Sequence, residues 1–235
     1  IFADLEMIEK VLEKRRKVAR NDKEVAKEVE VLDKVKEVLE EGKSARVLNL
    51  NDDEKKLLRS YQLLSTKPII YVCNVNEEDA ANDGADNPYV AKVREFAKGE
   101  NAEVSIVSAK IEQEISELDT DEEKADFLEM LGLEESGTDK VIKDSYKTLD
   151  LISYLTTGEM ETRAWTIKDG TKAVDAAGKI HSDISRGFIK AEIVSYEDLV
   201  NSGSINAARE KGLLRMEGKD YIMKDGDVVN FKFNV

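Results

Sequence analysis

Two short apolar runs, each followed by a small polar segment, constrain the fold of this chain more than any other feature. The first run, residues 69–72, is followed by the segment NVNE at 74–77. The second run, residues 104–107, is followed by SAK at 108–110. Two buried strands that flank a helix form a βαβ unit, and ligands bind in such sheets at the carboxyl ends of the strands. The pattern therefore predicts an α/β fold with a ligand site made by these two polar segments.

The cysteine content and the hydropathy of the chain exclude several classes of protein. Cys73 is the single cysteine among 235 residues, which excludes a disulfide framework, and its place in an apolar run predicts a buried structural thiol. No apolar run approaches the ~18 residues of a membrane span, and no signal peptide is visible. We therefore expect a cytoplasmic protein without a membrane partner.

The net charge of −14 is unevenly distributed along the chain. Residues 1–150 carry 24 Lys and Arg against 37 Asp and Glu, whereas residues 151–235 carry 12 against 13. A nucleic-acid partner, if there is one, is better sought in the last third, where residues 162–190 have a net charge of +3, although a scattered charge excess of this kind is more often an ordinary surface. His181, the single histidine, has no neighbouring pattern typical of a catalytic triad or metal site, so we expect a structural or hydrogen-bonded surface role.

Residues 1–66 are predicted to form a helical hairpin. Apolar residues recur at spacings of three and four over 5–18 and again over 25–39, with a polar break between them. Two helices of similar length joined by a tight turn are expected to pack antiparallel, as in a coiled coil. Asn51 and the acids after it predict the start of a third helix, with apolar residues as far as Leu64. The apolar stripes are either packing seams or the surface of an arm that contacts a large partner.

Residues 67–150 are predicted to hold the βαβ unit and the helices that follow it. The expected strands are 67–73 and 103–107, with a loop over 79–88 between them, and the expected helices are 89–98, 112–118, 121–131 and 137–149.

Residues 151–235 are predicted to form a small mixed domain. The expected elements are strands at 151–155, 162–167, 188–194, 221–223 and 228–235, a helix over 171–177, and short helices at 197–200 and 206–210. Gly178 is expected to end the first of these helices, and Gly158-Glu159 is expected to form a turn. The order strand-strand-helix-strand with a closing hairpin is typical of a ubiquitin-like β-grasp fold.

The two polar segments are similar to NKxD and SAK, the loops that read the base in guanine-nucleotide switches. The NKxD aspartate accepts hydrogen bonds from N1–H and the N2 amine of guanine, whereas adenine presents a lone pair at N1. Here Val75 stands where the lysine stem would cover the base, and Glu77 stands where the aspartate would be. Because the longer carboxylate cannot occupy the same place, the segment is expected to lose the guanine preference and to admit adenine.

The phosphate-binding motif GxxxxGK[ST] does not occur in these 235 residues. That loop provides the backbone N–H groups that hold phosphates and the hydroxyl that holds Mg²⁺. The sequence therefore predicts a base pocket without a phosphate pocket, and we expect this chain alone to be inactive in nucleotide hydrolysis.

Residues 163–199 and 218–235 closely resemble the C-terminal TGS domain of the YchF-type Obg-like ATPases, part of the Obg/TRAFAC P-loop family. The resemblance extends back through residues 127–137, the SAK and NVNE segments and the hairpin, and so covers essentially the whole chain. It implies a partial P-loop G-domain sheet with an inserted antiparallel coiled-coil hairpin and a C-terminal β-grasp TGS domain. The implied domains are an arm at 1–66, the C-terminal part of the G domain at 67–150, and the TGS domain at 151–235.

The resemblance also implies the ligand and the residues that contact it. The implied base-binding residues are Asn74, Val75, Glu77, Ser108, Ala109 and Lys110. The implied nucleotide is ATP in preference to GTP, and the Mg²⁺ ligands are expected upstream of this chain. No catalytic or metal-binding residue can be carried over to this sequence.

Two functions of different classes follow. The first is a ribosome-associated ATPase, of which this chain is the C-terminal two-thirds. In this alternative the TGS domain and the arm contact the ribosome, either its large subunit or the whole 70S or 80S particle. RNA is a further candidate partner of the same two parts. The second is a non-catalytic ribosome- or RNA-binding adaptor made of the arm and the TGS domain. A GTPase is a third and weaker alternative, and preferential binding of GTP would contradict the interpretation of Glu77.

Overall fold

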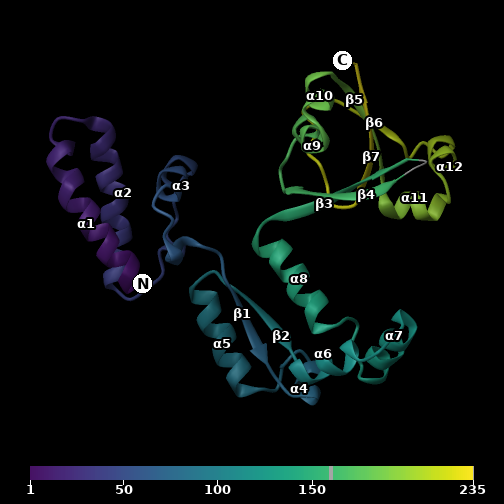
Figure 1. The fold of residues 1–235 in the computed structure, drawn as a ribbon, viewed down its shortest axis with the longest axis horizontal. Coiled ribbons are helices and arrows are strands. Elements are labelled where there is room, and N and C mark those ends of the chain that lie inside the picture. Colours follow the sequence, from purple (N-terminus) through teal and green to yellow (C-terminus); the bar gives the residue numbers. More distant parts are fainter. Residues whose placement is uncertain (159–160, 235) are drawn as a thin grey trace. The chain divides into compact units, whose positions relative to one another are not determined.

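The computed structural model describes residues 1–158 and 161–234 (Figure 1). Glu159 of the predicted turn and Val235 of the predicted last strand lie outside the described residues. The chain divides into two compact units, Ile1–Thr148 and Leu149–Val235. The hairpin and the βαβ unit belong to the same N-terminal unit. The division of that unit into an arm and a nucleotide-binding part remains a prediction.

The N-terminal unit is mostly helical. Its elements in chain order are α1 (Phe2–Ala19), α2 (Lys23–Glu40), η1 (Ala45–Val47), α3 (Asp52–Arg59), η2 (Leu64–Thr66), β1 (Ile70–Asn74), α4 (Glu77–Ala81), α5 (Pro88–Gly99), β2 (Glu103–Val107), α6 (Ala109–Ser116), α7 (Asp121–Met130) and α8 (Gly137–Thr148).

Helices α1 and α2 pack side by side as a hairpin (Figure 1). The apolar stripes predicted from the sequence supply the contact, with Ile8 and Leu12 of α1 buried against Leu32 and Val35 of α2. Asp22 begins α2 because its carboxylate accepts hydrogen bonds from the N–H groups of Glu24 and Val25. The hydrophobic core continues into the base of the hairpin through Ala45, Leu50, Leu58 and Leu63.

A buried carboxylate holds the base of the hairpin together. Asp4 in the first turn of α1 is 6% exposed and accepts hydrogen bonds from the backbone N–H groups of Ser65, at 2.7 Å, and Leu64, at 3.3 Å. Burial raises the pKa of Asp4, but the hydrogen bonds from Ser65 and Leu64 outweigh it and hold the pKa below its ordinary value. The start of α1 is thereby fixed to the segment that leads into β1.

Glu100, which follows α5, joins the base of the hairpin to the sheet. Its carboxylate accepts hydrogen bonds from the Tyr71 hydroxyl at 2.6 Å and the Ser44 hydroxyl at 2.8 Å. An Arg46 guanidinium nitrogen lies 3.4 Å from the same carboxylate. The Tyr71 hydrogen bond is the largest cause of a lowered Glu100 pKa, which burial partly opposes. One charged group therefore receives donors from β1 and from two residues at the foot of the hairpin.

Strands β1 and β2 pair in parallel, as the βαβ pattern predicts. Helix α5 connects them, and both α5 and α8 pack against the two strands. Strand β1 is less buried than expected, since Val72 is 53% exposed and Cys73, predicted to be a buried thiol, is half-buried. Among the described residues β1 pairs with β2 alone, so part of its surface is uncovered.

The C-terminal unit contains a five-stranded mixed sheet in its described residues, in the order β4-β3-β7-β5-β6. The pair β3–β7 is parallel and the others are antiparallel. The elements in chain order are β3 (Leu151–Thr157), β4 (Thr162–Lys168), α9 (Ala173–Ile180), α10 (Ser182–Arg186), β5 (Phe188–Ser195), α11 (Tyr196–Ser202), α12 (Ile205–Glu210), β6 (Arg215–Glu217) and β7 (Asp227–Phe233).

Helix α9 packs against the sheet through small side chains. Ala173, Ala176 and Ala177 are fully buried, and their size allows the helix to approach the strands closely. Tyr154 of β3 is also fully buried, and its hydroxyl donates a 2.8 Å hydrogen bond to the Ala176 carbonyl. Burial raises the pKa of Tyr154, so the phenol stays protonated and keeps this hydrogen bond.

Two local predictions for the C-terminal unit were wrong, and the short elements α10 and β6 were not predicted. Gly178 lies inside α9, which continues to Ile180, and does not end it. A side chain there would come within 3.3 Å of the Ser185 Cβ atom, so the glycine serves the close packing of α9 against α10. Residues 221–223 form no strand, and only Ile222 makes an isolated bridge, to Lys172. The edge strand β6 was missed because its charged sequence lacks a strand pattern.

Replacing a buried leucine of the hairpin should destabilise the protein far more than replacing an exposed one. Leu32→Ala removes a side chain that is 0% exposed, and we expect the free energy of unfolding to fall by about 2–5 kcal/mol. Leu64→Ala, at 65% exposure, is the matched control and should change it by less than about 1 kcal/mol. Urea unfolding followed by circular dichroism measures both. Equal effects would contradict the packing described.

Asp4 should stabilise the protein in a pH-dependent manner. Asp4→Ala leaves buried N–H groups without an acceptor and should cost about 1–3 kcal/mol at neutral pH. Because the folded-state pKa of Asp4 is lowered, this difference should be complete above about pH 4 and should shrink as the pH falls through the folded-state pKa. Urea unfolding of both proteins between pH 2 and 7 tests this, with the exposed Asp53→Ala as control. A pH-independent difference would be contrary to the assigned role.

Candidate functional site

The parallel pairing of β1 and β2 brings the two polar segments together. Asn74 at the end of β1 lies opposite Val107 at the end of β2. The Val75 N–H then donates a 2.9 Å hydrogen bond to the Val107 carbonyl, so the strands stay paired up to the point where both segments begin. The NVNE and SAK segments are therefore adjacent at the carboxyl edge of the sheet.

Asn74 links the two segments directly. Its side-chain oxygen accepts a 3.0 Å hydrogen bond from the backbone N–H of Ala109. Ala109 is the first residue of α6, and the N-cap residue Ser108 makes no side-chain capping bond. Asn74 therefore satisfies one of the N–H groups at the start of α6 that have no partner within the helix. This use of the amide oxygen orients the side chain and leaves its NH₂ end to donate elsewhere.

The structure places part of the SAK segment in a helix. Residues 112–118 were predicted as the helix, but α6 begins three residues earlier, so Ala109 and Lys110 lie in its first turn. Helix α4 likewise begins at Glu77, inside a region expected to be a loop. The Asn76 side chain caps α4 by accepting a 2.7 Å hydrogen bond from the Asp79 N–H. Each polar segment thus ends at a helix N-terminus, and both helices begin at the same edge of the sheet.

Lys110 and Glu77 form an ion pair between the segments. The Lys110 Nζ atom lies 2.5 Å from Oε1 of Glu77 and 3.8 Å from Oε1 of Glu114. The hydrogen bond to Glu77 is the main cause of a raised Lys110 pKa. The two side chains are 70% and 40% exposed, so the pair is accessible to a ligand. The carboxylate of Glu77 is therefore held by a side chain of the other segment.

The other predicted residues differ in exposure. Val75 is half-buried and Ala109 is exposed. Ser108 is 3% exposed, and its hydroxyl oxygen has no hydrogen-bond partner among the described residues. The structure therefore brings all six predicted residues to one edge of the sheet, and which of them contact a base remains a prediction.

A polar cavity of about 270 Å³ lies next to this edge. Its lining includes Ser108, Glu112, Gly137 and Lys140, and Ser108 is the one predicted site residue among its lining residues. The Glu112 carboxylate accepts hydrogen bonds from the N–H groups of Gly137, at 2.7 Å, and Thr138, at 3.0 Å. It thereby fixes α6 to the N-terminus of α8, where a negative charge is favourable.

This role of Glu112 has no direct signal in the sequence. The residue lies 25 positions before Gly137, and a Glu in a helix is ordinary. Gly137 is explained by the same contact. A Cβ atom there would lie 2.8 Å from a Val107 methyl group and 3.0 Å from Glu112 Oε1. Glycine at this position lets α8 begin close to Val107 of β2 and to Glu112 of α6.

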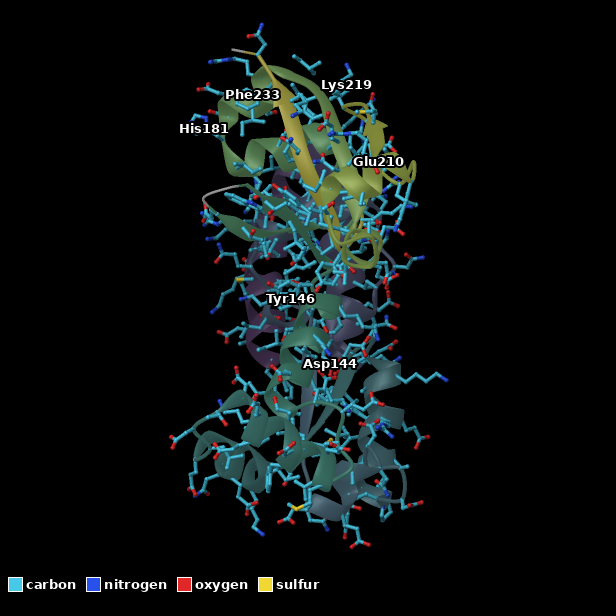
Figure 2. All side chains as sticks on the ribbon, turned by 90° about the vertical axis from the view of Figure 1, so that its right-hand side faces the viewer. Asp144, Tyr146, His181, Glu210, Lys219 and Phe233 are labelled. Atoms are coloured by element: carbon cyan, nitrogen blue, oxygen red, sulfur yellow. The ribbon has the colours of Figure 1, made fainter. Side chains whose placement is uncertain are left out.

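The remaining residues that the sequence singled out have structural roles. The His181 Nδ1 atom accepts a 3.2 Å hydrogen bond from the Asp183 N–H and so caps α10, and Figure 2 shows the residue at the surface of the C-terminal unit. Within residues 1–158 and 161–234, no three His, Cys, Asp or Glu side chains are arranged to hold a metal ion. No helix in the described part of the chain is long and apolar enough to span a membrane.

Comparison with known proteins relates the chain to one family. The family model YchF-GTPase_C, described as "Protein of unknown function (DUF933)", matches residues 151–234. A Bacillus subtilis protein and a Haemophilus influenzae protein, both named "Ribosome-binding ATPase YchF", are 51% and 45% identical over the whole chain. The chain covers 64% and 63% of their lengths.

A solved structure has the same fold. This structure, named "Structure of the Schizosaccharomyces pombe YchF GTPase", matches 98% of this chain with a TM-score of 0.85 and 32% sequence identity, and 62% of that protein is covered. The relatives and the solved structure match both units described above, and the family model matches the C-terminal unit. Over its whole length the chain is similar to members of the YchF family.

Proposed function

We propose that the protein containing this chain is a ribosome-associated Obg-like ATPase that binds ATP in preference to GTP. In this proposal the chain supplies the two segments that contact the base. The names of the relatives support an ATPase that associates with ribosomes, whereas the protein in the solved structure is called a GTPase. The choice of nucleotide is therefore the point that an experiment must decide.

The hydrogen bond between Asn74 and Ala109 carries the proposal. It fixes the spacing of the NVNE and SAK segments at the edge where parallel sheets bind ligands. Because the amide oxygen is used inside the protein, a ligand would meet the amide NH₂ group, which can only donate. A purine offers N7 as an acceptor for such a group. The chain thus presents a preformed donor to a base.

The bases differ at the edge that Glu77 would face. The length of Glu77 does not by itself exclude guanine, because a free carboxylate that reaches this edge would accept from N1–H and the N2 amine. Adenine presents an acceptor at N1 and is repelled by a free carboxylate. In this chain the carboxylate is bound to Lys110. A neutralised carboxylate supports binding of adenine over guanine.

The described residues are assigned to binding, and none is assigned to the hydrolytic step. Mg²⁺ would neutralise the charge on the phosphates, and we assign no residue of this chain to it. The role of this chain in the reaction is to hold the base, and through it the nucleotide, in one orientation.

The helical hairpin and the C-terminal unit are proposed to contact the ribosome. In this proposal the hairpin acts as a coiled-coil arm, and the C-terminal sheet with α9 is a β-grasp domain of the TGS type. Three basic residues of the 162–190 stretch are paired with acids, in the pairs Arg163–Glu161, Lys172–Asp220 and Arg186–Asp183. This pairing weakens the positive surface expected there, and an RNA contact of the C-terminal unit remains a prediction.

The tip of the hairpin, residues 14–27, is more basic than the 162–190 stretch of the C-terminal unit. Residues 14–27 contain seven Lys or Arg and two acids, although residues 1–150 as a whole are strongly acidic. Three of these cations, Arg15, Arg16 and Lys17, are paired with acids, as are three of the 162–190 stretch, so the positive charge that distinguishes the tip lies at its turn. Arg20 and Lys23 lie at the turn between α1 and α2, and both are exposed. A positive tip on an acidic protein favours contact of the tip with a phosphate backbone.

Removing the amide that joins the two segments should weaken nucleotide binding. In the full protein, Asn74→Ala is expected to lower the affinity for ATP and for GTP by roughly tenfold, because each loses a donor and the segments lose their spacing. Calorimetry with Mg²⁺ and each nucleotide measures this, with the exposed Asn206→Ala of α12 as control. An unchanged affinity would show that the base binds elsewhere. A wild-type protein that binds neither nucleotide would favour the adaptor alternative.

Reversing the charge at the hairpin tip should weaken the association with ribosomes. Arg20→Glu with Lys23→Glu is expected to lower the fraction that co-sediments with ribosomes several-fold, and most at low salt, because phosphate contacts are lost. Lys55→Glu with Lys56→Glu, on the exposed surface of α3, is the matched control. Equal sedimentation of the two double variants would exclude the tip as the contact surface.

A further inference from the structure

The ion pair between Lys110 and Glu77 connects the two segments that the proposed function assigns to the base. Glu77 is the first residue of α4, and Lys110 is the second residue of α6. The two residues are 33 positions apart, and the pair exists because the strands before them are paired. It lies at the same edge of the sheet as the bond between Asn74 and Ala109. A base bound at that edge would meet the ammonium and the carboxylate together.

The pair changes what Glu77 can offer to a ligand. One oxygen of the carboxylate accepts from the Lys110 ammonium, and the charge of the carboxylate is balanced. An ammonium has three N–H donors and no acceptor, so donors remain for a second partner. Adenine N1 is an acceptor and matches such a donor. Guanine has two donors at this edge, N1–H and the N2 amine, beside the acceptor O6, so an ammonium placed against N1 meets a donor.

We propose that Lys110 determines the choice of purine by holding the Glu77 carboxylate away from the donors of guanine and by presenting an ammonium donor in its place. The inference rests on the proposed function and assigns its preference for ATP to one side chain. Selectivity then arises from a repulsive element against the wrong base as well as an attractive one for the right base.

The pair contributes little to the stability of the fold. Both side chains are substantially exposed, and exposed ion pairs have small effects on stability. Neither residue belongs to a buried cluster of the N-terminal unit. Replacing Lys110 should therefore leave the protein folded, and a change in nucleotide selectivity can be assigned to the site itself.

The test compares the ratio of ATP to GTP affinity in the full protein and its Lys110→Met variant. Methionine keeps the length and the apolar stem of the side chain but removes the charge and the donors. ATP and GTP carry the same triphosphate, so the ratio isolates the base. We expect the ratio to fall by roughly tenfold, because the released carboxylate accepts from guanine and faces the lone pair of adenine. Calorimetry with Mg²⁺ and each nucleotide measures the ratio.

Three variants make the result specific. Lys143→Met is the matched control, since Lys143 is 71% exposed and its Nζ lies 2.5 Å from Glu135 on another part of the unit. It should leave the ratio unchanged. Lys110→Arg keeps a cationic donor and should retain the preference for ATP. Glu77→Gln combined with Lys110→Met removes the carboxylate, and the gain in GTP affinity should disappear.

The outcomes separate this inference from the proposed function. A wild-type preference for ATP that Lys110→Met leaves unchanged would overturn the inference and leave the proposed function in place. A wild-type protein that binds neither nucleotide, or prefers GTP, would overturn both. An equal loss of both affinities in Lys110→Met would assign Lys110 a general binding role and would also overturn the inference.

Discussion

The parallel pairing of β1 with β2 is the constraint on which the candidate site depends. It places Asn74 beside the start of α6, where the amide oxygen accepts from the Ala109 N–H. It also brings Lys110 within reach of Glu77, although neither side chain is held by a hydrophobic core. A change in the register of the two strands would move every one of these groups, because successive residues of a strand face opposite sides of the sheet.

The sequence predicted the elements whose burial pattern is regular. The hairpin α1–α2 was predicted because its apolar stripes form one core, and β1 and β2 were predicted because each apolar run ends in a polar segment. Elements that depend on distant contacts were not predicted. Strand β6 is short and charged, and its pairing with β5 defines it. Helix α9 continues through Gly178 to Ile180, and the glycine lies close to Ser185 of α10.

The same distinction applies to the site. The closeness of the two polar segments follows from the βαβ pattern, and so the sequence was sufficient to predict it. The ion pair between Lys110 and Glu77 could not be predicted, because its partners are exposed and no periodicity relates them. Glu112 was also missed. Its role in fixing α6 to α8 depends on two backbone N–H groups, and backbone groups leave no signal in the sequence.

Glu100 has a mechanical consequence for the N-terminal unit. Its carboxylate receives the Tyr71 hydroxyl from β1 and the Ser44 hydroxyl from the foot of the hairpin. Tyr71 lies three residues before Asn74 on the same strand, so the hairpin and the candidate site are fastened to one short rigid segment. A movement of the hairpin relative to the sheet would therefore strain the contacts of this carboxylate. The hairpin is also fixed by Asp4, which accepts from the Ser65 and Leu64 N–H groups ahead of β1, so tilting it requires that both sets of contacts break or that the strand follow.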